Sequence, residues 1–240
     1  MNIINATGQT KYGAKVATSL SRLGIIIDGA AMTKTELEQV TLQVIESGNG
    51  SNPVINRIPL WTLLEESAEI VGVFNFEPTV LEGMIDLTVD EMPYDAMEIN
   101  FLQVNIEGMN TDWNLKMFAI DSWGNDGALR NLEQKSVIGT SSQDLSLKGV
   151  KRMIIPINKI DSITVDYPEL KNLKSKSVTY EEDELKLLML EDDGIVYLKG
   201  KNATPKYHYE NNLILDVGSA IRCRIQPKAT AGDFNILLDK

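Results

Sequence analysis

Hydrophobic and polar residues alternate along most of the chain, a pattern typical of β-strands with one buried face. Four segments show this period of two most clearly, with apolar positions Val40/Leu42/Val44, Ile85/Leu87/Val89, Leu213/Leu215/Val217 and Phe234/Ile236/Leu238. Turn-forming residues separate such runs, for example at 48–53, 108–110, 124–127 and 192–194. Many short strands joined by polar turns predict an all-β sandwich or barrel and not a series of β-α-β units.

Two segments depart from this alternation. Pro59–Ser67 begins with a proline and places three leucines on one helical face, so we predict a short helix there. In Glu98–Ile106 the apolar set changes parity between Phe101 and Val104. One inserted residue would produce that change, so the segment predicts a β-bulge.

The length of 240 residues fits one large β domain or two smaller ones. Residues 122–149 are rich in Gly, Asn and Ser, and a strand-like pattern resumes at 150–157. We therefore predict two β units of similar size, 1–125 and 126–240, with the boundary in the range 125–142. The same stretch is also compatible with one long loop between strands. No convincing repeat is visible in the sequence.

Composition narrows the functional classes. Hydrophobic residues make up 43% of the chain and charged residues 24%, which is ordinary for a globular protein with a core. The formal charge of −11 argues against direct nucleic-acid binding, which requires clustered Lys and Arg. The small cluster Lys171, Lys174 and Lys176 lies near the acidic run Glu181–Glu184, and we interpret both as solvated loop or edge-strand charge. Neither a signal peptide nor a membrane-spanning stretch is visible, so we expect a soluble or at most peripheral protein.

Catalytic signatures are missing from the sequence. The single histidine, His208, has no His or Cys nearby at the spacing of a zinc site, and no nucleophile motif accompanies it. The single cysteine, Cys223, alternates with Ile221 and Ile225, which predicts a small buried core residue. A chain without cysteine pairs suits maturation in a reducing cytoplasm. We expect no enzymatic activity and no cofactor.

Two binding interpretations remain open. Asp121 and Asp126 lie in an acidic turn whose oxygens could hold a structural calcium ion, although we favour the interpretation that they are solvated turn acids. The tryptophans Trp61, Trp113 and Trp123 could form a sugar-stacking surface, or they could pack in the core or at a subunit contact. A carbohydrate-binding β-sandwich is therefore an alternative function.

Three consecutive segments carry a resemblance to a known family: Leu23–Gly29, Met32–Val44 and Pro53–Leu64. They read as a short strand, a Met-Thr turn followed by an acidic residue, a long amphipathic strand, and then a turn leading to a short helix. This succession resembles the opening of the major capsid proteins of tailless, membrane-containing icosahedral phages, the corticovirus-like double jelly-roll group. It covers the N-terminal third of the chain and is a pattern, not a diagnostic motif.

The resemblance implies a structural virion protein made of two jelly rolls, with an N-terminal arm formed by Met1–Lys15. It implies homotrimers that act as pseudo-hexagonal capsomers of an icosahedral shell, in contact with neighbouring capsomers and other virion proteins and indirectly with an internal membrane. Such a protein is made in the host cytoplasm and resides in the virion. Another phage part, such as a penton or spike base, is an alternative within the same class.

Overall fold

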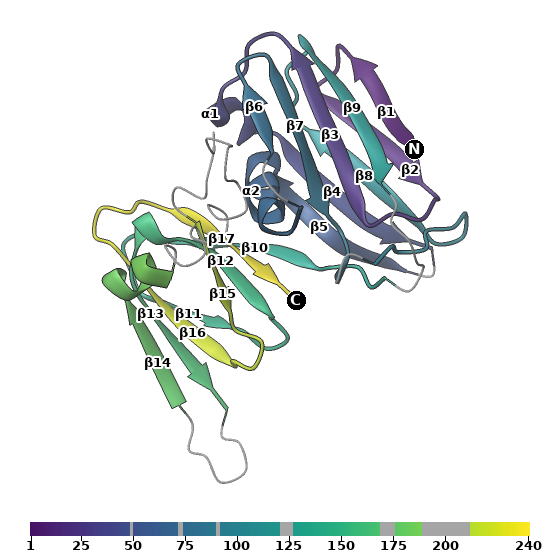
Figure 1. Ribbon diagram of the computed structural model, residues 1–240. Helices are drawn as coiled ribbons and strands as arrows, with labels where there is room; N and C mark the ends of the chain where they lie inside the picture. The colour runs from purple at the N-terminus through teal and green to yellow at the C-terminus, as the bar shows by residue number, and fades with distance from the viewer. Residues whose placement is uncertain (49, 72–73, 90–91, 121–126, 169–175, 189–211) are drawn as a thin grey trace. The chain divides into compact units, whose positions relative to one another are not determined.

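The computed structural model describes residues 1–48, 50–71, 74–89, 92–120, 127–168, 176–188 and 212–240 (Figure 1). These residues form two compact units: unit 1 is Met1–Leu132, and unit 2 is the described part of residues 133–240. The sequence-based boundary at 125/126 lies a few residues before this division.

Unit 1 consists of strands and two helices. Its strands are β1 (Asn2–Thr7), β2 (Lys11–Val16), β3 (Arg22–Gly29), β4 (Thr41–Ser47), β5 (Ser51–Pro59), β6 (Asn75–Glu77), β7 (Val80–Asp86), β8 (Phe101–Glu107) and β9 (Trp113–Ile120). The helices are α1 (Lys34–Leu37) and α2 (Leu60–Val71). One sheet has the order β1-β9-β3-β7-β6, and the unit 1 strands of the other sheet have the order β2-β8-β4-β5.

Unit 2 repeats this organisation with β10 (Leu132–Val137), β11 (Gln143–Ser146), β12 (Arg152–Pro156), β13 (Ile160–Tyr167), β14 (Lys176–Glu181), β15 (Asn212–Asp216), β16 (Arg222–Pro227) and β17 (Phe234–Asp239). A 3-10 helix, η2 (Ile157–Lys159), follows β12, and an α-helix over 182–188 follows β14. The unit 2 strands of one sheet have the order β10-β17-β12-β15, and those of the other have the order β11-β16-β13-β14.

The two units have the same strand connectivity. When the strands are lettered B to I along the chain, β1–β5 and β7–β9 of unit 1 give sheets B-I-D-G and C-H-E-F, with β6 as an extra strand beside G. Strands β10–β17 of unit 2 give the same two orders. This connectivity is that of the jelly roll. The protein is therefore a double jelly roll, as the sequence and its resemblance predicted.

Each unit buries one face of its sheets. In unit 1 the predicted set Val40, Leu42 and Val44 is fully buried. In unit 2 the core cluster includes residues from both sheets, such as Met153 of β12 and Ile225 of β16. The alternation read from the sequence therefore identifies the core faces correctly in both units.

The predicted short helix is α2, which occupies the F–G connection of unit 1. Leu60, Leu63 and Leu64 are all fully buried, as their shared face predicted. Trp61 lies between Leu60 and Leu63 in the sequence and contacts Phe74 and Phe76 edge to face, with its ring centroid 5.1 and 5.2 Å from theirs. Buried aromatic contacts of this kind add to the hydrophobic stabilisation of the helix.

The expected N-terminal arm over Met1–Lys15 is wrong, because these residues form β1 and most of β2. β1 pairs with β9, and β2 pairs with β8. Ile4, Tyr12 and Val16 are buried, while the residues between them are more exposed and mostly polar or small. Only three large apolar residues are buried in the two strands, so the pattern in the sequence was too sparse to recognise.

The β-bulge predicted within Glu98–Ile106 is also wrong. β8 begins at Phe101 and pairs with β2 and β4 without a register shift along its length. Leu102, Val104 and Ile106 face the core, whereas Ile99 lies outside the strand and is exposed. The apparent change of parity arises because Phe101 faces outward, where the Lys15 Nζ lies 4.5 Å from its ring centroid.

The stretch 122–149 was read as a possible loop, yet it contains β10 and β11. β11 is exposed on alternate positions and pairs with β16 from Gln143 to Ser146. A strand of four mostly polar residues shows too little alternation of apolar and polar positions to be identified from the sequence.

Candidate interaction surface

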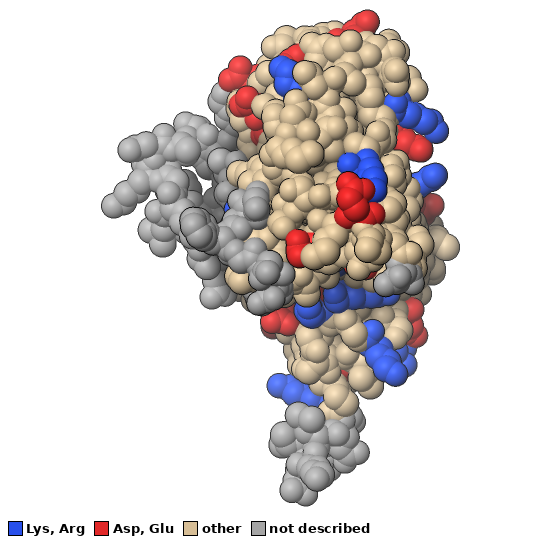
Figure 2. All heavy atoms as spheres, turned by 90° about the vertical axis from the view of Figure 1, so that its right-hand side faces the viewer, with Lys and Arg blue, Asp and Glu red and all other residues tan. Residues whose placement is uncertain are grey.

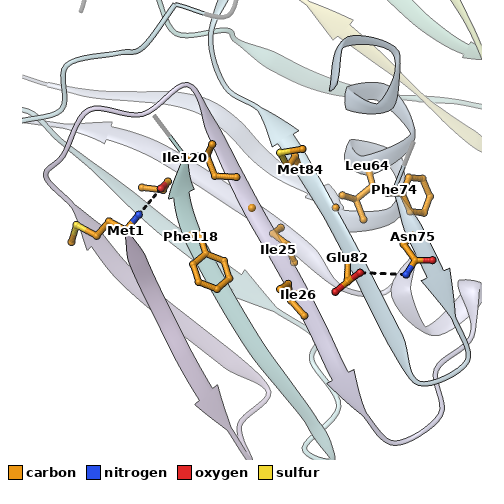
Figure 3. A pocket seen from close by; sticks show the side chains of 13 residues that line it. Met1, Ile25, Ile26, Leu64, Phe74, Asn75, Glu82, Met84, Phe118 and Ile120 are labelled. Carbon is orange, nitrogen blue, oxygen red and sulfur yellow. Dashed lines mark hydrogen bonds between the residues drawn. The ribbon is translucent and has the colours of Figure 1, made fainter. Parts of the chain in front are cut away.

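An apolar hollow of about 630 Å³ opens on the β1-β9-β3-β7-β6 sheet of unit 1 (Figure 3). Ile26, Met84, Phe118 and Ile120 project into it from β3, β7 and β9. All four are partly buried and lie on the face opposite to the core. The volume and the apolar lining are in the range of surfaces that bind other molecules.

Gly24 creates the centre of the hollow. It lies opposite Met84 on β7 and Phe118 on β9, so the outward face has no side chain between these two. A Cβ atom at this position would lie 2.8 Å from the Ile120 Cδ1, which occupies part of the free space. A larger residue at position 24 would therefore displace Ile120 and fill the depression.

A second glycine brings α2 close to the sheet. A Cβ atom at Gly83 would lie 2.6 Å from the Leu64 Cδ2 and 3.0 Å from the Phe74 Cβ. Because Gly83 has no side chain, the helix and the segment after it can approach β7 closely. The hollow extends to Leu64 and Phe74 at this end.

Polar groups are confined to the rim of the hollow and to the far half of the sheet face. At the rim, the Asn75 Nδ2 donates to the Glu82 Oε2 at 3.3 Å. Further along, the Asp28 carboxylate accepts from the Asn114 Nδ2 at 2.6 Å and from the Lys116 Nζ at 3.0 Å. These two hydrogen bonds lower the pKa of Asp28. The same face is thus apolar in one half and hydrogen-bonded in the other.

Beneath α2, unit 1 contains a buried ionic cluster. Arg130 donates from Nη1 to the Glu66 Oε2 at 3.1 Å, and its Nη2 pairs with the Glu66 Oε1. Asp86 lies 3.7 Å from the Arg130 Nη1 and 3.6 Å from the Arg22 Nε. Ser67 donates to Glu66 and accepts from the Asp86 backbone N–H at 3.0 Å. The cluster joins α2 to β3, β7 and the segment that leads out of unit 1, which is a structural role.

Unit 2 carries two ion pairs on the exposed face of its β11-β16-β13-β14 sheet. Arg224 donates from Nε to the Asp144 Oδ1 at 3.0 Å, and Arg222 from Nε to the Asp166 Oδ2 at 2.9 Å. Ser177 of β14 donates to the other Asp166 oxygen at 2.6 Å. The hydrogen bond from Arg224 lowers the pKa of Asp144, and the bonds from Ser177 and Arg222 lower that of Asp166.

The charges of the chain are unevenly divided. Of the 23 Lys and Arg residues and 34 Asp and Glu residues, 7 and 18 lie in residues 1–132, giving −11, and 16 and 16 lie in residues 133–240, giving 0. The whole net charge therefore belongs to the first jelly roll. Figure 2 shows one face of the molecule, on which charged groups lie singly or beside groups of opposite sign, between uncharged areas.

The candidate calcium ligands Asp121 and Asp126 lie outside the described residues, as does His208. Within the residues that are described, no group of three or more His, Cys, Asp or Glu side chains could hold a metal ion. Cys223 is fully buried, as predicted, and its Sγ lies 3.7 Å from the Met153 Sδ. Burial raises the pKa of this thiol to about 12, so it is not a reactive group.

Trp61 and Trp113 are each only 1% exposed, so neither can stack on a sugar at the surface. Their core positions confirm the packing interpretation for these two residues, while Trp123 lies outside the described part of the chain. In that described part, no helix has both the length and the hydropathy to cross a bilayer.

Sequence reasoning did not identify the hollow. The available signal was the uninterrupted apolar run Leu23–Ile27, in which Ile26 breaks the expected polar alternation. Phe118 and Ile120 show the same departure on β9, where they face outward between core residues. Outward apolar positions on neighbouring strands indicate a surface that is covered by something.

Comparison with known proteins gives similarity in fold alone. No family profile matches the chain, and no curated protein matches it. The major capsid protein of STIV matches with a TM-score of 0.56 and 10% identity, covering 100% of this chain and 93% of that one. A chain in the atomic structure of Sulfolobus turreted icosahedral virus matches with a TM-score of 0.57 and 12% identity, covering 100% of this chain and 87% of the other. Both jelly rolls therefore correspond to those of a single solved capsid chain.

Proposed function

We propose that this protein is a capsid subunit of an icosahedral virus and that three copies form a pseudo-hexagonal capsomer. The observation that carries the proposal is the presence of two complete jelly rolls of identical connectivity in one chain. The whole-length match to a viral major capsid protein supports it. In this role the protein is structural, resides in the virion after synthesis in the host cytoplasm, and has no catalytic step to perform.

The two-unit chain gives a simple route to a hexagonal tile. Three copies arranged by cyclic symmetry place six jelly rolls in a ring, and such rings can pack side by side in a shell. The contacts within the ring are heterologous, because one surface of a copy meets a different surface of the next. The partners implied are other copies, neighbouring capsomers and other virion proteins, with an internal membrane reached only indirectly.

Light scattering during size-exclusion chromatography of the full chain, over a range of protein concentration and salt, tests the proposal. We expect a trimer, or larger assemblies whose mass is a multiple of the trimer. A protein that remains monomeric at every concentration would overturn the capsomer. A stable pentamer would favour the penton alternative, because the two roles differ in the symmetry of the assembly.

A further inference from the structure

The hollow of unit 1 is a concave site and not a flat apolar patch. Met84 and Phe118 flank Gly24 on the neighbouring strands, and Ile26 and Ile120 lie on either side of it along the strands (Figure 3). Because position 24 has no side chain, strand backbone forms the floor between these four side chains. The volume of about 630 Å³ lies in the range of sites that hold small molecules.

The apolar area is small for a protein interface. From Arg22, which lies opposite Ile120, to Ile26 the strand advances four residues, or about 13 Å, and β9 and β7 are two strand spacings, or about 10 Å, apart. Polar side chains limit the area at Ile26, which has Lys116 and Glu82 opposite it. A standard protein interface covers about 800 Å² of each partner, several times this area. The dimensions therefore favour a small molecule as the occupant.

Glu82 is the only charged side chain in the lining of the hollow. Its carboxylate accepts from the Asn75 Nδ2 at 3.3 Å, and no Lys or Arg among the described residues forms an ion pair with it. Lys116, two strands away in the same row, is paired with Asp28 at 3.0 Å. An apolar site with an unneutralised carboxylate at its rim matches an apolar molecule that carries a positive charge at one end.

The other polar group at the hollow belongs to the sheet. On the β1 side, the Met1 nitrogen donates to the Ala119 carbonyl oxygen at 2.8 Å (Figure 3). The Ala119 N–H donates in return to the Met1 carbonyl oxygen at 2.8 Å. These two bonds extend the pairing of β1 with β9, so the group already has its partner.

We propose that the hollow binds one molecule of a cationic amphiphile. Its alkyl chain lies over Gly24 between Met84 and Phe118, and its ammonium group lies beside the Glu82 carboxylate. The chain removes the apolar floor and walls from water, and the ammonium group neutralises the rim. This site goes beyond the capsomer role and does not depend on it, since every residue of the site belongs to unit 1.

Isothermal titration calorimetry of the full chain with decyltrimethylammonium, kept below the concentration at which it forms micelles, tests the proposal. We expect saturable binding of one molecule per chain. Butyltrimethylammonium should bind at least about tenfold more weakly, because it buries fewer methylene groups. Decyl sulfate should bind severalfold more weakly than decyltrimethylammonium, because its charge would lie beside a carboxylate of the same sign.

Two variants change the hollow, and each has a matched control on the outward face of the other sheet of unit 1. Gly24→Val fills the centre with a residue that strands favour, and Glu82→Gln removes the charge at nearly constant shape. The controls are Gly13→Val, where a Cβ atom would likewise approach a flexible side chain, the Asn105 Oδ1 at 2.9 Å, and Glu107→Gln. Thermal melting establishes that each variant is folded.

We expect Gly24→Val to weaken binding of decyltrimethylammonium at least about tenfold. Glu82→Gln should abolish the preference for the ammonium over the sulfate, and both controls should bind like the unmodified protein. The proposal is overturned if the unmodified protein shows no saturable binding, or if Gly24→Val binds as tightly as Gly13→Val. Decyl sulfate that binds as tightly as the ammonium would overturn the assignment of a cationic ligand.

Two further measurements identify other occupants. If Gly24→Val changes the mass of the assembly in light scattering while Gly13→Val does not, another copy of the chain covers the hollow. If the protein floats with phosphatidylcholine vesicles but binds no dissolved amphiphile, the surface recognises a bilayer and not a single molecule. Either result overturns the amphiphile site, and neither contradicts the capsomer.

Discussion

The two jelly rolls share their connectivity but differ in where their polar and ionic groups lie. Unit 1 buries an ionic cluster around Arg130. The outward face of its C-H-E-F sheet has amides at its centre, where Asn105 donates to the Gln43 side chain at 3.3 Å, and one exposed ion pair, Lys11 with Glu107. Unit 2 presents ion pairs, such as Arg224 with Asp144, on the corresponding face. A jelly roll therefore requires a particular pattern of buried apolar positions, but it leaves the location of charge free for other uses.

The comparison can be tested separately in each unit, because the chain provides natural reporters. Its three tryptophans, Trp61, Trp113 and Trp123, all lie in residues 1–132, and its single cysteine, Cys223, lies in unit 2. Tryptophan fluorescence therefore follows the unfolding of unit 1, and thiol labelling follows that of unit 2. Each prediction below uses one of these signals.

The largest effect is expected for Arg130→Met. The substitution leaves Glu66 without the guanidinium that neutralises it in a buried site, and breaking a buried pair in this way costs about 3–5 kcal/mol. Urea unfolding followed by tryptophan fluorescence measures the loss. Adding Glu66→Gln should recover part of it, because the uncompensated charge is then removed.

The matched change in unit 2 is Arg224→Met, which breaks an ion pair that solvent already screens. We expect no measurable shift in the urea midpoint of Cys223 labelling. Equal losses in the two units would show that buried and exposed ion pairs do not differ here as their environments predict.

A somewhat smaller effect is expected for Leu64→Ala in α2. Leu64 is fully buried against Gly83, and truncating it leaves a cavity that costs about 2–5 kcal/mol. Leu187→Ala, in the helix after β14, is the control because Leu187 is largely exposed. Tryptophan fluorescence follows the unfolding of unit 1. If unit 1 of Leu64→Ala unfolds at the same midpoint as in the unmodified protein, this contact does not hold the helix in place.

Acid should weaken unit 2 in a defined pH window. Hydrogen bonds from Lys186 and Lys228 lower the pKa of Glu182 to about 2, and the pKa values of Asp144 and Asp166 are also lowered. A lowered folded pKa gives stability that is present above the unfolded pKa of about 4 and is lost as pH falls through the folded pKa. We expect Cys223 labelling, with a disulfide reagent that works in acid, to require less urea as pH falls from about 4 to about 2.

Asp144→Asn combined with Asp166→Asn should reduce that dependence and leave the part that Glu182 contributes. Glu65 in unit 1 gives the opposite pH dependence of stability. Burial raises its pKa, so protonation favours the folded state. An unchanged acid response in the double variant would mean that these carboxylates do not account for the weakening.

The smallest effect is expected on the labelling rate of Cys223 in unit 2 when unit 1 is destabilised. Because Cys223 is buried with a pKa of about 12, we expect its labelling at neutral pH to be at least about 100-fold slower in the folded protein than in urea. Arg130→Met should leave the native labelling rate unchanged, since the ionic cluster belongs to unit 1 alone. A faster rate in that variant would instead show that unit 2 depends on unit 1 for its stability.

Local pattern predicted the elements that bury a regular apolar face. The set Val40, Leu42 and Val44 and the helix at Pro59–Ser67 were found because period and burial agree there. β1 and β11 were missed, since short strands in which at least half of the residues are polar show little periodicity. Their position in the sheets is set by partners distant in sequence, such as Lys116 opposite Asn5.

The hollow could not be predicted for a related reason. Gly24, Met84 and Phe118 come from three strands, and only the register of the sheet brings them together. The internal repeat was also invisible, because the two units repeat an order of strands and not a series of residues. An uninterrupted apolar run such as Leu23–Ile27 was the one local sign of an outward surface that needs cover.

The position of β1 has a consequence for how the chain is made. β1 lies beside β9, with Asn2 opposite Phe118, so β1 has no sheet partner until β9, the last strand of its unit, emerges from the ribosome. At ordinary rates of synthesis that delay is on the order of 10 s. A strongly apolar strand would be exposed to aggregation for all of that time. Half of the residues of β1 are polar, which weakened its pattern in the sequence and also limits the apolar surface that the nascent chain exposes before β9 is made.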